Sequence, residues 1–483
     1  MMNKEEVKQA ALRRWPSANA FYHERDNRTL LEVANLANYA QREIEIRIDP
    51  SCAGRPAVQA MALLAANLTA RWARNVRLIV PEATLCPQFR RGRYHLLAER
   101  IEDEMRMADP FGNFQIEEAA RGDEKPELRL LIGAFQQAPG LQPGDYVINA
   151  VGWSAVGRRG RGFDDEISSP ATMAAAGLVA SLGVADLFKR AIGHPRAHWL
   201  PEFSWSTWSH RLWSGLFVDS KTPAPPPHLD LGETLLAGVG AVGSAFLYLA
   251  DLMPLRGALT LLDRDQVETS NLNRSPMFKF EDALAAVGKT AVARSYLAHQ
   301  DIRTNTVTGT WHEHSARMAE HPFDVWISLT NEDAAWAEVP FLLPPVVLQA
   351  TTTSGWGMGA GRHIPRREDC TLCRLPRPEA KFRGPCAEGN VAVEESNPPV
   401  QAALPFLSAG AASLLLAEYL KLEGGSLAAL PNEVGTDLRY GLRAVIASKR
   451  AALSHCRGCA VSQSRMWQSR GGRGRFSYYS LAA

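Results

Sequence analysis

The chain has 483 residues, of which 46% are hydrophobic, so it is long enough for two or more domains and can bury a sizeable core. Its 53 Lys and Arg nearly balance its 51 Asp and Glu, and the net charge of +2 gives no reason to expect a nucleic acid or an acidic membrane as partner. The N-terminus lacks an apolar run with a cleavage site, and no apolar stretch is long enough to cross a membrane, so a cytoplasmic protein is expected.

The first half of the chain predicts a β-α-β unit. REIEIRID (42–49) alternates apolar and polar residues as a strand does, RPAVQAMALLAANLTARWA (55–73) has helical spacing, and VRLIVPEA (76–83) is a second apolar run. The proline-rich segment KTPAPPPHLD (221–230) then favours an extended linker. ETLLAGVG, AVGSAFLYLADLM and GALTLLDRD, all within 233–265, repeat the strand–helix–strand order. We therefore expect two α/β domains with parallel sheets.

An internal repeat indicates that the two halves are duplicates. VASLGVADLFK (179–189) aligns without gaps with AASLLLAEYLK (411–421), and each segment lies late in its half. Where the second half has GVGAVG, the first has DPSCAGRPA, which lacks the glycines that let backbone approach a phosphate, so the first half is expected to be an inactive partner. The predicted division is an inactive domain at 1–220, the linker at 221–230, an active domain at 231–461 and an Arg-rich flexible tail at 462–483.

A glycine-rich turn in the second half predicts a nucleotide site. Gly238, Gly240 and Gly243 form G-x-G-x-x-G between an expected strand and an expected helix, where bare backbone and a helix N-terminus can receive phosphate oxygens. The glycines alone are equally typical of an NAD-binding domain, in which an acid at the end of the second strand binds ribose.

The stretch LLDRDQVETSNLNR (261–274) favours a triphosphate over a dinucleotide. Asp263 stands where a ribose-binding acid belongs, and Asp265 follows it. A dinucleotide enzyme has no evident need for Asn271 and Arg274 just beyond them. An amide and a guanidinium that meet phosphate oxygens suit ATP.

With these motifs the sequence resembles the ThiF/MoeB superfamily, which includes the ubiquitin-activating enzymes, through its glycine turn, its D-x-D and its S-N-L-x-R, over roughly residues 235–459. The resemblance implies two Rossmann-like domains fused as a pseudodimer, and ATP and Mg²⁺ used to adenylate the C-terminal glycine of a ubiquitin-like protein. It implies that Asp263 binds ribose and that Asn271 and Arg274 bind phosphates. RDNRTL (25–30) resembles the segment that opens these domains, so Arg28 is expected to reach into the partner domain's ATP site.

Two positions depart from the family's pattern. The family's lysine is expected at Ala291, so we expect Lys289 in the segment VGKTA to take its place. The family's magnesium-binding aspartate is replaced by Asn331, whose uncharged oxygen holds Mg²⁺ less strongly, and Glu332 or Asp333 is expected to supply the charge.

Two C-x-x-C pairs predict a structural Zn²⁺ site. Four thiolates satisfy tetrahedral zinc and leave no position open for catalysis. The expected ligands are Cys370, Cys373, Cys456 and Cys459.

A further cysteine, Cys386, lies in the polar loop FRGPCAEGN, where the family carries its acyl-accepting cysteine in members that make a thioester. Lys381 and Arg383 are nearby cations that would favour a thiolate. An idle loop cysteine is the other interpretation.

The sequence therefore predicts a ubiquitin-activating-type enzyme that adenylates a ubiquitin-like partner, takes the acyl group onto Cys386 and passes it to a ubiquitin-conjugating-like enzyme, with an association with antiphage defence. The alternatives are a sulfur-carrier adenylyltransferase, a catalytically weak binding scaffold and an NAD dehydrogenase, the last disfavoured by SNLNR and the cysteine pairs. Whether the pseudodimer is a monomer or assembles further is left open.

Overall fold

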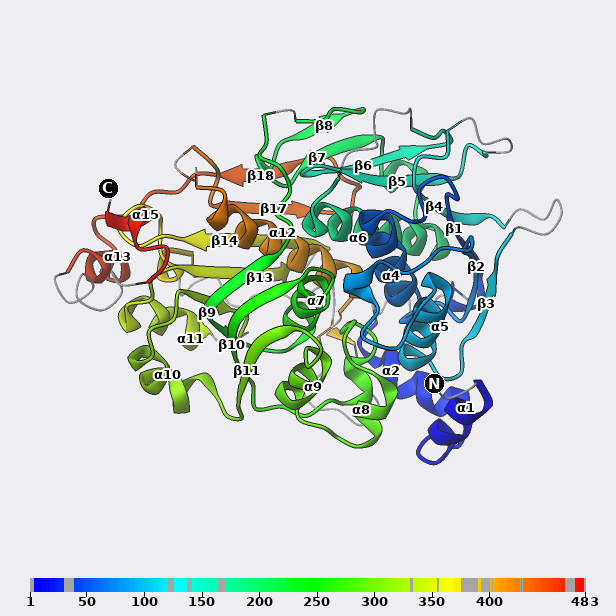
Figure 1. Ribbon diagram of the computed structural model, residues 1–483, viewed down its shortest axis with the longest axis horizontal. Coiled ribbons are helices and arrows are strands. Elements are labelled where there is room, and N and C mark those ends of the chain that lie inside the picture. Colours follow the sequence, from blue (N-terminus) through cyan, green and yellow to red (C-terminus); the bar gives the residue numbers. More distant parts are fainter. Residues whose placement is uncertain are drawn as a thin grey trace.

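The fold is described from a computed structural model of the chain (Figure 1). The parts that the structure describes are residues 4–29, 39–119, 126–136, 141–163, 170–219, 221–330, 333–353, 356–374, 390–391, 400–401, 403–425, 427, 429–464 and 474–481. Within these residues, no helix combines the length and the apolar character that a membrane crossing needs.

The first half of the chain forms one eight-stranded sheet in the order β3-β2-β1-β4-β5-β6-β7-β8. The five strands from β3 to β5 pair in parallel, and β6, β7 and β8 continue the sheet antiparallel. Their bounds are β1 (Glu43–Ile48), β2 (Asn75–Ile79), β3 (Asn113–Glu117), β4 (Leu128–Ile132), β5 (Tyr146–Val151), β6 (Ser154–Arg159), β7 (Phe203–Ser206) and β8 (Leu212–Ser214).

The second half repeats this topology strand for strand. Its sheet has the order β11-β10-β9-β12-β13-β14-β17-β18, again parallel from β11 to β13 and antiparallel beyond. Their bounds are β9 (Leu229–Ala237), β10 (Leu255–Leu262), β11 (Asp301–Val307), β12 (Val325–Ser328), β13 (Val347–Thr353), β14 (Gly357–His363), β17 (Glu433–Asp437) and β18 (Val445–Ser448). The prediction of two Rossmann-like α/β domains is confirmed.

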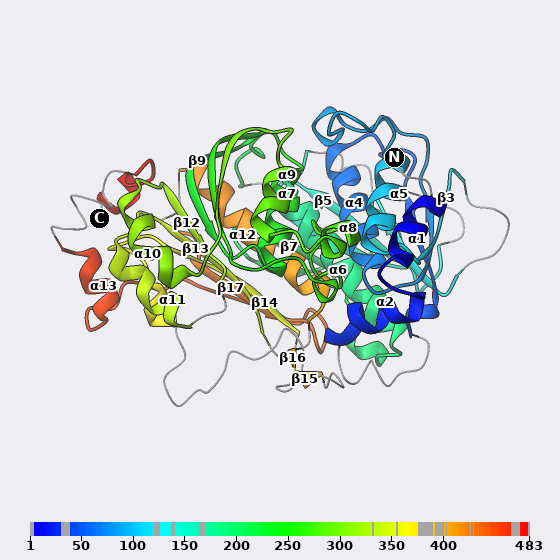
Figure 2. The ribbon, with the colours of Figure 1, turned by 90° about the horizontal axis from the view of Figure 1, so that it is seen from below.

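Helices pack between and around the two sheets, and the halves lie side by side as two lobes (Figure 2). The first lobe carries α4 (Pro56–Ala70), α5 (Leu97–Ala108) and α6 (Met173–Ala191), preceded by α1 (Lys4–Leu12), α2 (Ala18–Arg25) and η1 (Asp26–Arg28). The second carries α7 (Ala241–Ala250), η6 (Thr269–Asn271), α8 (Phe280–Leu284), α9 (Lys289–Tyr296), α10 (Trp311–Glu320), α11 (Asp333–Glu338), η7 (Val339–Leu342), η8 (Thr371–Arg374), α12 (Pro405–Glu423), α13 (Arg457–Ser462) and α15 (Tyr478–Leu481). Shorter pieces are η2 (Tyr39–Gln41), η3 (Pro87–Phe89), η5 (Arg196–His198), β15 (Asn390–Val391) and β16 (Val400–Gln401).

The helices α6 and α12 hold the two lobes together at the centre of the molecule (Figure 1). They contain the two copies of the sequence repeat, and their serines make the same bond: Ser181 Oγ donates to Gly177 O and Ser413 Oγ to Ala409 O, both at 2.7 Å. A Cβ on Gly177 would lie 2.6 Å from Ser413 Oγ, so the helices can approach this closely only with glycine there. One continuous apolar core spans both lobes.

A buried ion pair also repeats between the lobes. In the first, Asp186 of α6 accepts Arg159 of β6 at 2.6 Å, and in the second, Glu418 of α12 accepts Arg362 of the corresponding strand β14 at 2.5 Å. Asp186 and Glu418 occupy the same position of the sequence repeat. Matching ion pairs at matching positions support the duplication that the sequence predicts.

Residues 474–481 are the described part of the end of the segment 462–483, for which the sequence predicts a flexible tail. Arg475 forms ion pairs with Asp230 at 3.0 Å and Glu423 at 2.9 Å, and Tyr479 is buried with its hydroxyl on Leu422 O at 2.8 Å. Apolar and aromatic residues among the arginines explain this, because burying an aromatic side chain stabilises a docked segment. Residues 474–481 therefore pack against the second lobe.

Candidate functional site

The glycine turn lies between β9 and α7, where the sequence places it. Gly238 has φ +98°, and a Cβ there would lie 2.8 Å from Leu329 O at the end of β12. A Cβ on Gly243 would lie 2.2 Å from Gly238 O, so these two glycines permit tight packing of strand and helix. Gly240, the N-cap of α7, has nothing within 4 Å of an added Cβ and faces open space. The turn thus presents bare backbone at a helix N-terminus, which suits phosphate.

Asp263 lies directly after β10 and faces this turn. Its Oδ2 accepts the Val239 N–H at 2.7 Å, and its Oδ1 accepts the Asp265 N–H at 2.9 Å. The carboxylate is partly exposed, so it can accept a further donor such as a sugar hydroxyl. This is the place at which the sequence predicts ribose.

The polar segment after Asp263 folds back through η6. Asn271 Oδ1 accepts the Glu268 N–H at 3.1 Å, which closes the turn, and the Arg274 guanidinium donates to Ser270 O and to Asn273 Oδ1. Asn271 and Arg274 are both buried. Their side chains shape the segment as well as carrying the groups expected to meet phosphates.

Lys289 joins the same group of polar side chains. It begins α9, its Nζ forms an ion pair with Asp265 Oδ2 at 2.8 Å, and its backbone N–H donates to Asp265 O. Partial burial would raise the pKa of Asp265, but the hydrogen bond and the charge of Lys289 outweigh it and hold that pKa below its ordinary value. Asp265 is therefore ionised at neutral pH and keeps the Lys289 ammonium beside the site.

The end of β12 adds two hydroxyl groups that the sequence reasoning missed. Ser328 Oγ and Thr330 Oγ1 are buried and have no hydrogen-bond partner within the described part of the chain. Their position after a strand adjacent to β9 is the signal that could have found them, because ligands of open α/β sheets bind at the carboxyl ends of the strands. Asn331 and Glu332 lie outside the described residues, and so does the side chain of Asp333, so the magnesium prediction is not tested.

Arg28 lies at the boundary between the lobes. It ends η1, which contacts η6, and its carbonyl accepts the Ala403 N–H at 2.7 Å just before α12. Its Nε is buried and has no partner among the residues that the structure describes. Arg25, by contrast, is fully bonded to Asp26 and Asp109, both at 2.7 Å. Both α2, which ends at Arg25, and η1 contact η6, and of these two arginines Arg28 is the one with an unsatisfied donor.

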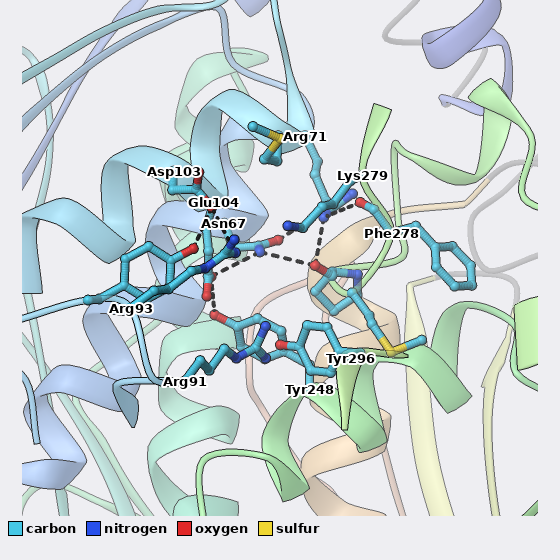
Figure 3. Close-up of a pocket in the computed structure, with 14 residues that line it drawn as sticks. Asn67, Arg71, Arg91, Arg93, Asp103, Glu104, Tyr248, Phe278, Lys279 and Tyr296 are labelled. Carbon is cyan, nitrogen blue, oxygen red and sulfur yellow. Dashed lines mark hydrogen bonds and ion pairs between the residues drawn. The ribbon is translucent and has the colours of Figure 1, made fainter. Parts of the chain in front are cut away.

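A small polar cavity of about 20 Å³ lies between the lobes (Figure 3). Residues 276–279, which follow the η6 segment, line it from the second lobe. Glu104 accepts Arg100 Nε at 2.8 Å, Asn67 Nδ2 at 3.2 Å and the Tyr248 hydroxyl at 2.5 Å. Burial would raise the pKa of Glu104, but the charges of Arg100 and Arg91 hold it below its ordinary value. The cavity has room for about one water and links first-lobe helices to the second lobe through charged and polar groups.

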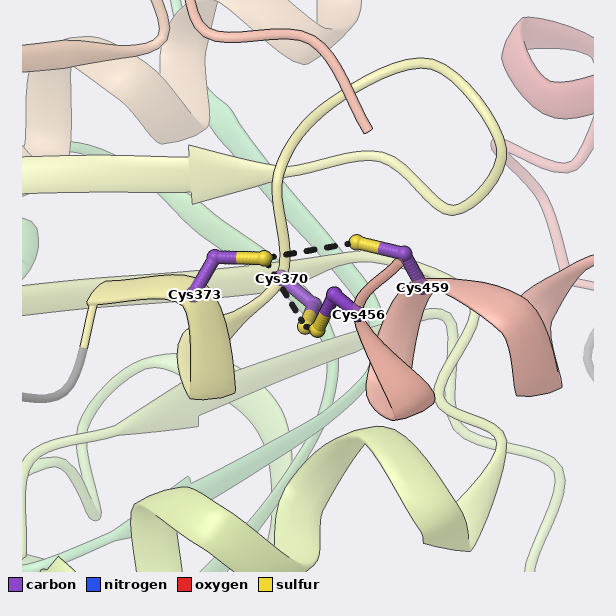
Figure 4. A group of neighbouring side chains, drawn as sticks. All are labelled: Cys370, Cys373, Cys456 and Cys459. Atoms are coloured by element: carbon purple, nitrogen blue, oxygen red, sulfur yellow. Dashed lines mark hydrogen bonds between the residues drawn. The ribbon is translucent and has the colours of Figure 1, made fainter. Parts of the chain in front are cut away.

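The four cysteines of the C-x-x-C pairs meet in space (Figure 4). Sγ–Sγ distances are 3.8 Å for Cys370–Cys373, 3.6 Å for Cys370–Cys456 and 3.5 Å for Cys373–Cys459, and all four sulfurs lie within 4.8 Å of one another. Sulfurs at ~2.3 Å from a tetrahedral Zn²⁺ are ~3.8 Å apart, so the donor set and its spacing fit zinc.

The cysteine group adjoins the strand end that carries the hydroxyls. Thr371, which follows Cys370, donates through Oγ1 to Trp336 O at 2.7 Å, and Trp336 Nε1 donates to Thr330 O at 2.9 Å. A metal at the cysteines would thus stabilise the chain just after β12. Cys386 lies outside the described residues, so the thioester prediction is not tested.

A groove of about 740 Å³ opens over β13, β14 and β17. Gly359 and Gly361 form part of its floor, and a Cβ on Gly361 would lie 1.9 Å from Arg374 Nη1. Gln349 Oε1 is buried without a partner among the described residues. Trp336 lines the groove, and its Nε1 donates to Thr330 O, so the groove adjoins the chain that follows β12.

Comparison with known proteins finds a family match within the second half. Residues 228–335 match the ThiF family, which confirms the resemblance to the ThiF/MoeB superfamily for that part of the chain. An uncharacterised protein of Sinorhizobium fredii, y4jF, is 28% identical over 269 residues, which are 54% of this chain, and the chain spans about half (49%) of that relative's length.

Solved structures of Escherichia coli MccB are also similar. The crystal structure with AMPCPP and MccA has a TM-score of 0.37 at 16% identity, covering 48% of this chain and 66% of that chain. The structure with ATP has a TM-score of 0.35 at 15% identity, covering 48% and 67%.

Proposed function

We propose that the protein is an ATP-dependent adenylyltransferase whose second lobe activates the C-terminal carboxylate of a ubiquitin-like protein. The observation that carries this proposal is a chain of contacts at the carboxyl edge of the second sheet: Asp263 accepts the N–H groups of Val239 and Asp265, and Asp265 pairs with Lys289. Asn271 and Arg274 follow in the same segment of the chain. Backbone N–H groups, an acid and three polar or cationic side chains are what ribose and a polyphosphate need. The match of residues 228–335 to the ThiF family supports the same activity.

In the proposed reaction the carboxylate oxygen attacks the α-phosphorus of ATP, an acyl–AMP bond forms, and pyrophosphate leaves. Mg²⁺, when bound, would neutralise phosphate charge, with Asn331 and Glu332 or Asp333 as its candidate ligands. Arg28 would meet the phosphates from the first lobe, which agrees with its unsatisfied Nε beside η6. The glycine-floored groove, with a volume of about 740 Å³, is where we place the polypeptide tail of the partner.

The second proposed step is a thioester. The Cys386 thiolate attacks the acyl carbon, AMP leaves, and the acyl group then passes to the thiol of a ubiquitin-conjugating-like enzyme. The Zn²⁺ proposed at Cys370, Cys373, Cys456 and Cys459 has a structural role in this scheme, since four protein ligands fill its coordination sphere. We place the protein in a ubiquitin-like conjugation system, with antiphage defence as the proposed setting.

Pyrophosphate exchange tests the first step. Purified protein with ATP and a ubiquitin-like partner is expected to incorporate labelled pyrophosphate into ATP, and Asp263→Ala is expected to reduce the exchange at sub-saturating ATP by roughly tenfold or more, because the ribose contact is lost. Asp49→Ala, in the corresponding turn of the first lobe, is the matched control and should retain the exchange. No exchange by the wild-type protein would refute adenylation.

A gel assay tests the second step. The full reaction is expected to give a DTT-sensitive adduct that Cys386→Ala abolishes and Cys86→Ala, a buried first-lobe cysteine, does not. An adduct that survives Cys386→Ala would overturn the assignment of Cys386. Pyrophosphate exchange without any adduct would favour the sulfur-carrier adenylyltransferase. Loss of both exchange and adduct would favour a binding scaffold. Asn331 at the position of the family's magnesium-binding aspartate is the sequence feature that supports this last alternative.

A further inference from the structure

Arg71, at the C-terminal end of α4 in the first lobe, reaches into the second lobe (Figure 3). It is fully buried, and its Nε donates to Asn67 Oδ1 at 2.8 Å. The rest of its guanidinium donates to three carbonyls of the other lobe, those of Leu272 at 2.6 Å, Pro276 at 2.8 Å and Phe278 at 3.1 Å. One side chain thus satisfies three backbone acceptors of a partner lobe.

The segment that Arg71 holds is the one that carries the expected phosphate groups. Leu272 and Pro276 stand on either side of Arg274, and η6 with Asn271 immediately precedes them. Residues between η6 and α8 belong to no helix or strand, so regular secondary structure does not fix their backbone. Turn hydrogen bonds within the segment, such as Ser275 N–H to Asn271 O at 3.1 Å and Phe278 N–H to Ser275 O at 3.1 Å, fix part of this backbone. The contacts from the first lobe hold carbonyls that these turns leave free.

The first lobe holds Arg71 rigidly in turn. Asn67 bonds Arg71 through its oxygen and Glu104 through its amide, and that amide also donates to Pro276 O at 3.1 Å. All the hydrogen-bond acceptors of Arg71 are neutral, and burial lowers the pKa of the guanidinium to about 9, which leaves it protonated at neutral pH. A planar guanidinium with several fixed donors can meet diverging carbonyls, which a lysine ammonium cannot do equally well.

We propose that Arg71 is a positioning residue that orders residues 271–278 from the first lobe and thereby sets the ATP affinity of the second. This inference rests on the proposed function for its effect on ATP, but the ordering itself does not. The proposal gives the first lobe, which lacks the glycine turn, a second role besides contributing Arg28. The first lobe holds the backbone that carries Asn271 and Arg274 in place.

The test compares Arg71→Met and Arg71→Lys with a matched buried arginine, Arg190, which also donates to three carbonyls, all in its own lobe: Glu127, Gly144 and Arg129. In pyrophosphate exchange, Arg71→Met is expected to raise the KM for ATP by roughly tenfold with a smaller change in kcat, and Arg71→Lys by less. Arg190→Lys is expected to lower the melting temperature without changing the KM. Hydrogen–deuterium exchange of residues 269–278 in the nucleotide-free protein should speed up only in the Arg71 variants.

The outcomes separate this inference from the proposed function. A melting temperature lowered as in Arg190→Lys, with the KM for ATP and the exchange of residues 269–278 both unchanged, would overturn the positioning role. If the wild-type protein neither binds ATP nor exchanges pyrophosphate, the proposed function fails, and the hydrogen exchange of the segment alone decides whether Arg71 orders it. If Arg71→Met does not fold, Arg71→Lys provides the same comparison.

Discussion

The turns that follow β1 and β9 occupy corresponding places in the two lobes and are built in opposite ways. After β1, the Asp49 carboxylate accepts the Ser51 N–H at 2.9 Å and the Phe135 N–H at 2.5 Å, so an anion of the protein already takes these donors. After β9, Gly238 and Gly240 carry no side chain in front of α7, Gly240 faces open space, and Asp263 accepts the Val239 N–H. A phosphate would be repelled by the first turn and received by the second. The shared strand order therefore fixes the shape of each lobe, and the turn decides its chemistry.

The outer faces of the two sheets also differ: that of the second lobe is apolar, and that of the first carries buried charges. In the second lobe, Leu235 and Trp326 pack under α10 and α11 in an apolar cluster. In the first, the same side of β1, β2 and β4 carries a buried charge network in which Glu45 forms ion pairs with Arg77 at 2.7 Å and Arg129 at 3.3 Å. The chain between β3 and β4 is also shorter than that between β11 and β12, which includes α10. Among its described residues the first lobe thus has neither the glycine turn nor a helix corresponding to α10, yet it keeps the α6–α12 packing.

The largest expected effect is the loss of metal from the second lobe, since the first has no comparable cysteine group among its described residues. Removal of zinc by a chelator, or Cys459→Ser, should lower the free energy of unfolding by ~4 kcal/mol or more, because metal binding and folding are coupled. Because one apolar core spans both lobes, the whole chain should unfold in a single transition at a lower temperature. Calorimetry with and without chelator, and zinc content by mass spectrometry, measure this.

Cys52→Ser in the first lobe is the control and should change neither the zinc content nor the response to chelator. Two separate transitions after chelation would contradict a shared core and show that the lobes are independently stable. Protein that purifies without equimolar zinc and is unaffected by chelator would refute the zinc site.

Glycine substitutions test directly whether the two turns differ in their effect on nucleotide binding. Gly243→Ala places a Cβ 2.2 Å from Gly238 O, so strand and helix must separate, and we expect a loss of ATP affinity of ~3 kcal/mol, a factor of roughly 100. Gly54→Ala in the turn of the first lobe has nothing within 4 Å of the new Cβ and should leave ATP affinity unchanged. Calorimetric titration with ATP measures both. Equal losses would mean that the first lobe binds nucleotide as well.

Much of the fold was predictable because its signals are local. The alternation in Glu43–Ile48 and the apolar spacing in Pro56–Ala70 predict β1 and α4, and the repeat in α6 and α12 predicts the duplication. The antiparallel strands were not predicted. GMGAGRH (β14) has a composition unfavourable for a strand, and it becomes one because it pairs with both β13 and β17.

The residues of the candidate site likewise include some that local sequence signals predict and others that depend on tertiary packing. The places of Gly238 and Asp263 could be predicted because each directly follows an apolar run that reads as a strand, and Asn271 was singled out from the motif SNLNR. Arg71 could not, because it reads as one more residue at the end of an alanine-rich helix, and its bonding partners lie about 200 residues later in the chain. Only tertiary packing brings it to the carbonyl of Leu272.

The smallest expected effect concerns acid stability at the contact between the lobes. His210 of the first lobe is buried with Nε2 2.7 Å from Glu418 and 2.8 Å from the Lys421 Nζ, both on α12. Burial, together with the charges of Lys421 and Arg362, lowers its pKa to about 4 despite the hydrogen bond that His210 donates to Glu418. In the unfolded chain His210 takes up a proton below its ordinary pKa of 6.5, whereas in the folded chain it does so only near pH 4. The free energy of unfolding should therefore fall as the pH falls from 6.5 to about 4.

His210→Gln keeps a donor for Glu418 but cannot titrate, so its melting temperature should fall less steeply between pH 6.5 and pH 4 than that of the wild-type protein. His363→Gln is the matched comparison, because burial lowers the pKa of His363 to about 4 as well, but its ring contacts Glu368 O within the second lobe. Both variants should flatten the acid limb, and only His210→Gln alters a bond between lobes. If acid instead splits the wild-type transition into two, the lobes part before they unfold. An unchanged slope in His210→Gln would mean that His210 takes up its proton as readily in the folded chain as in the unfolded one.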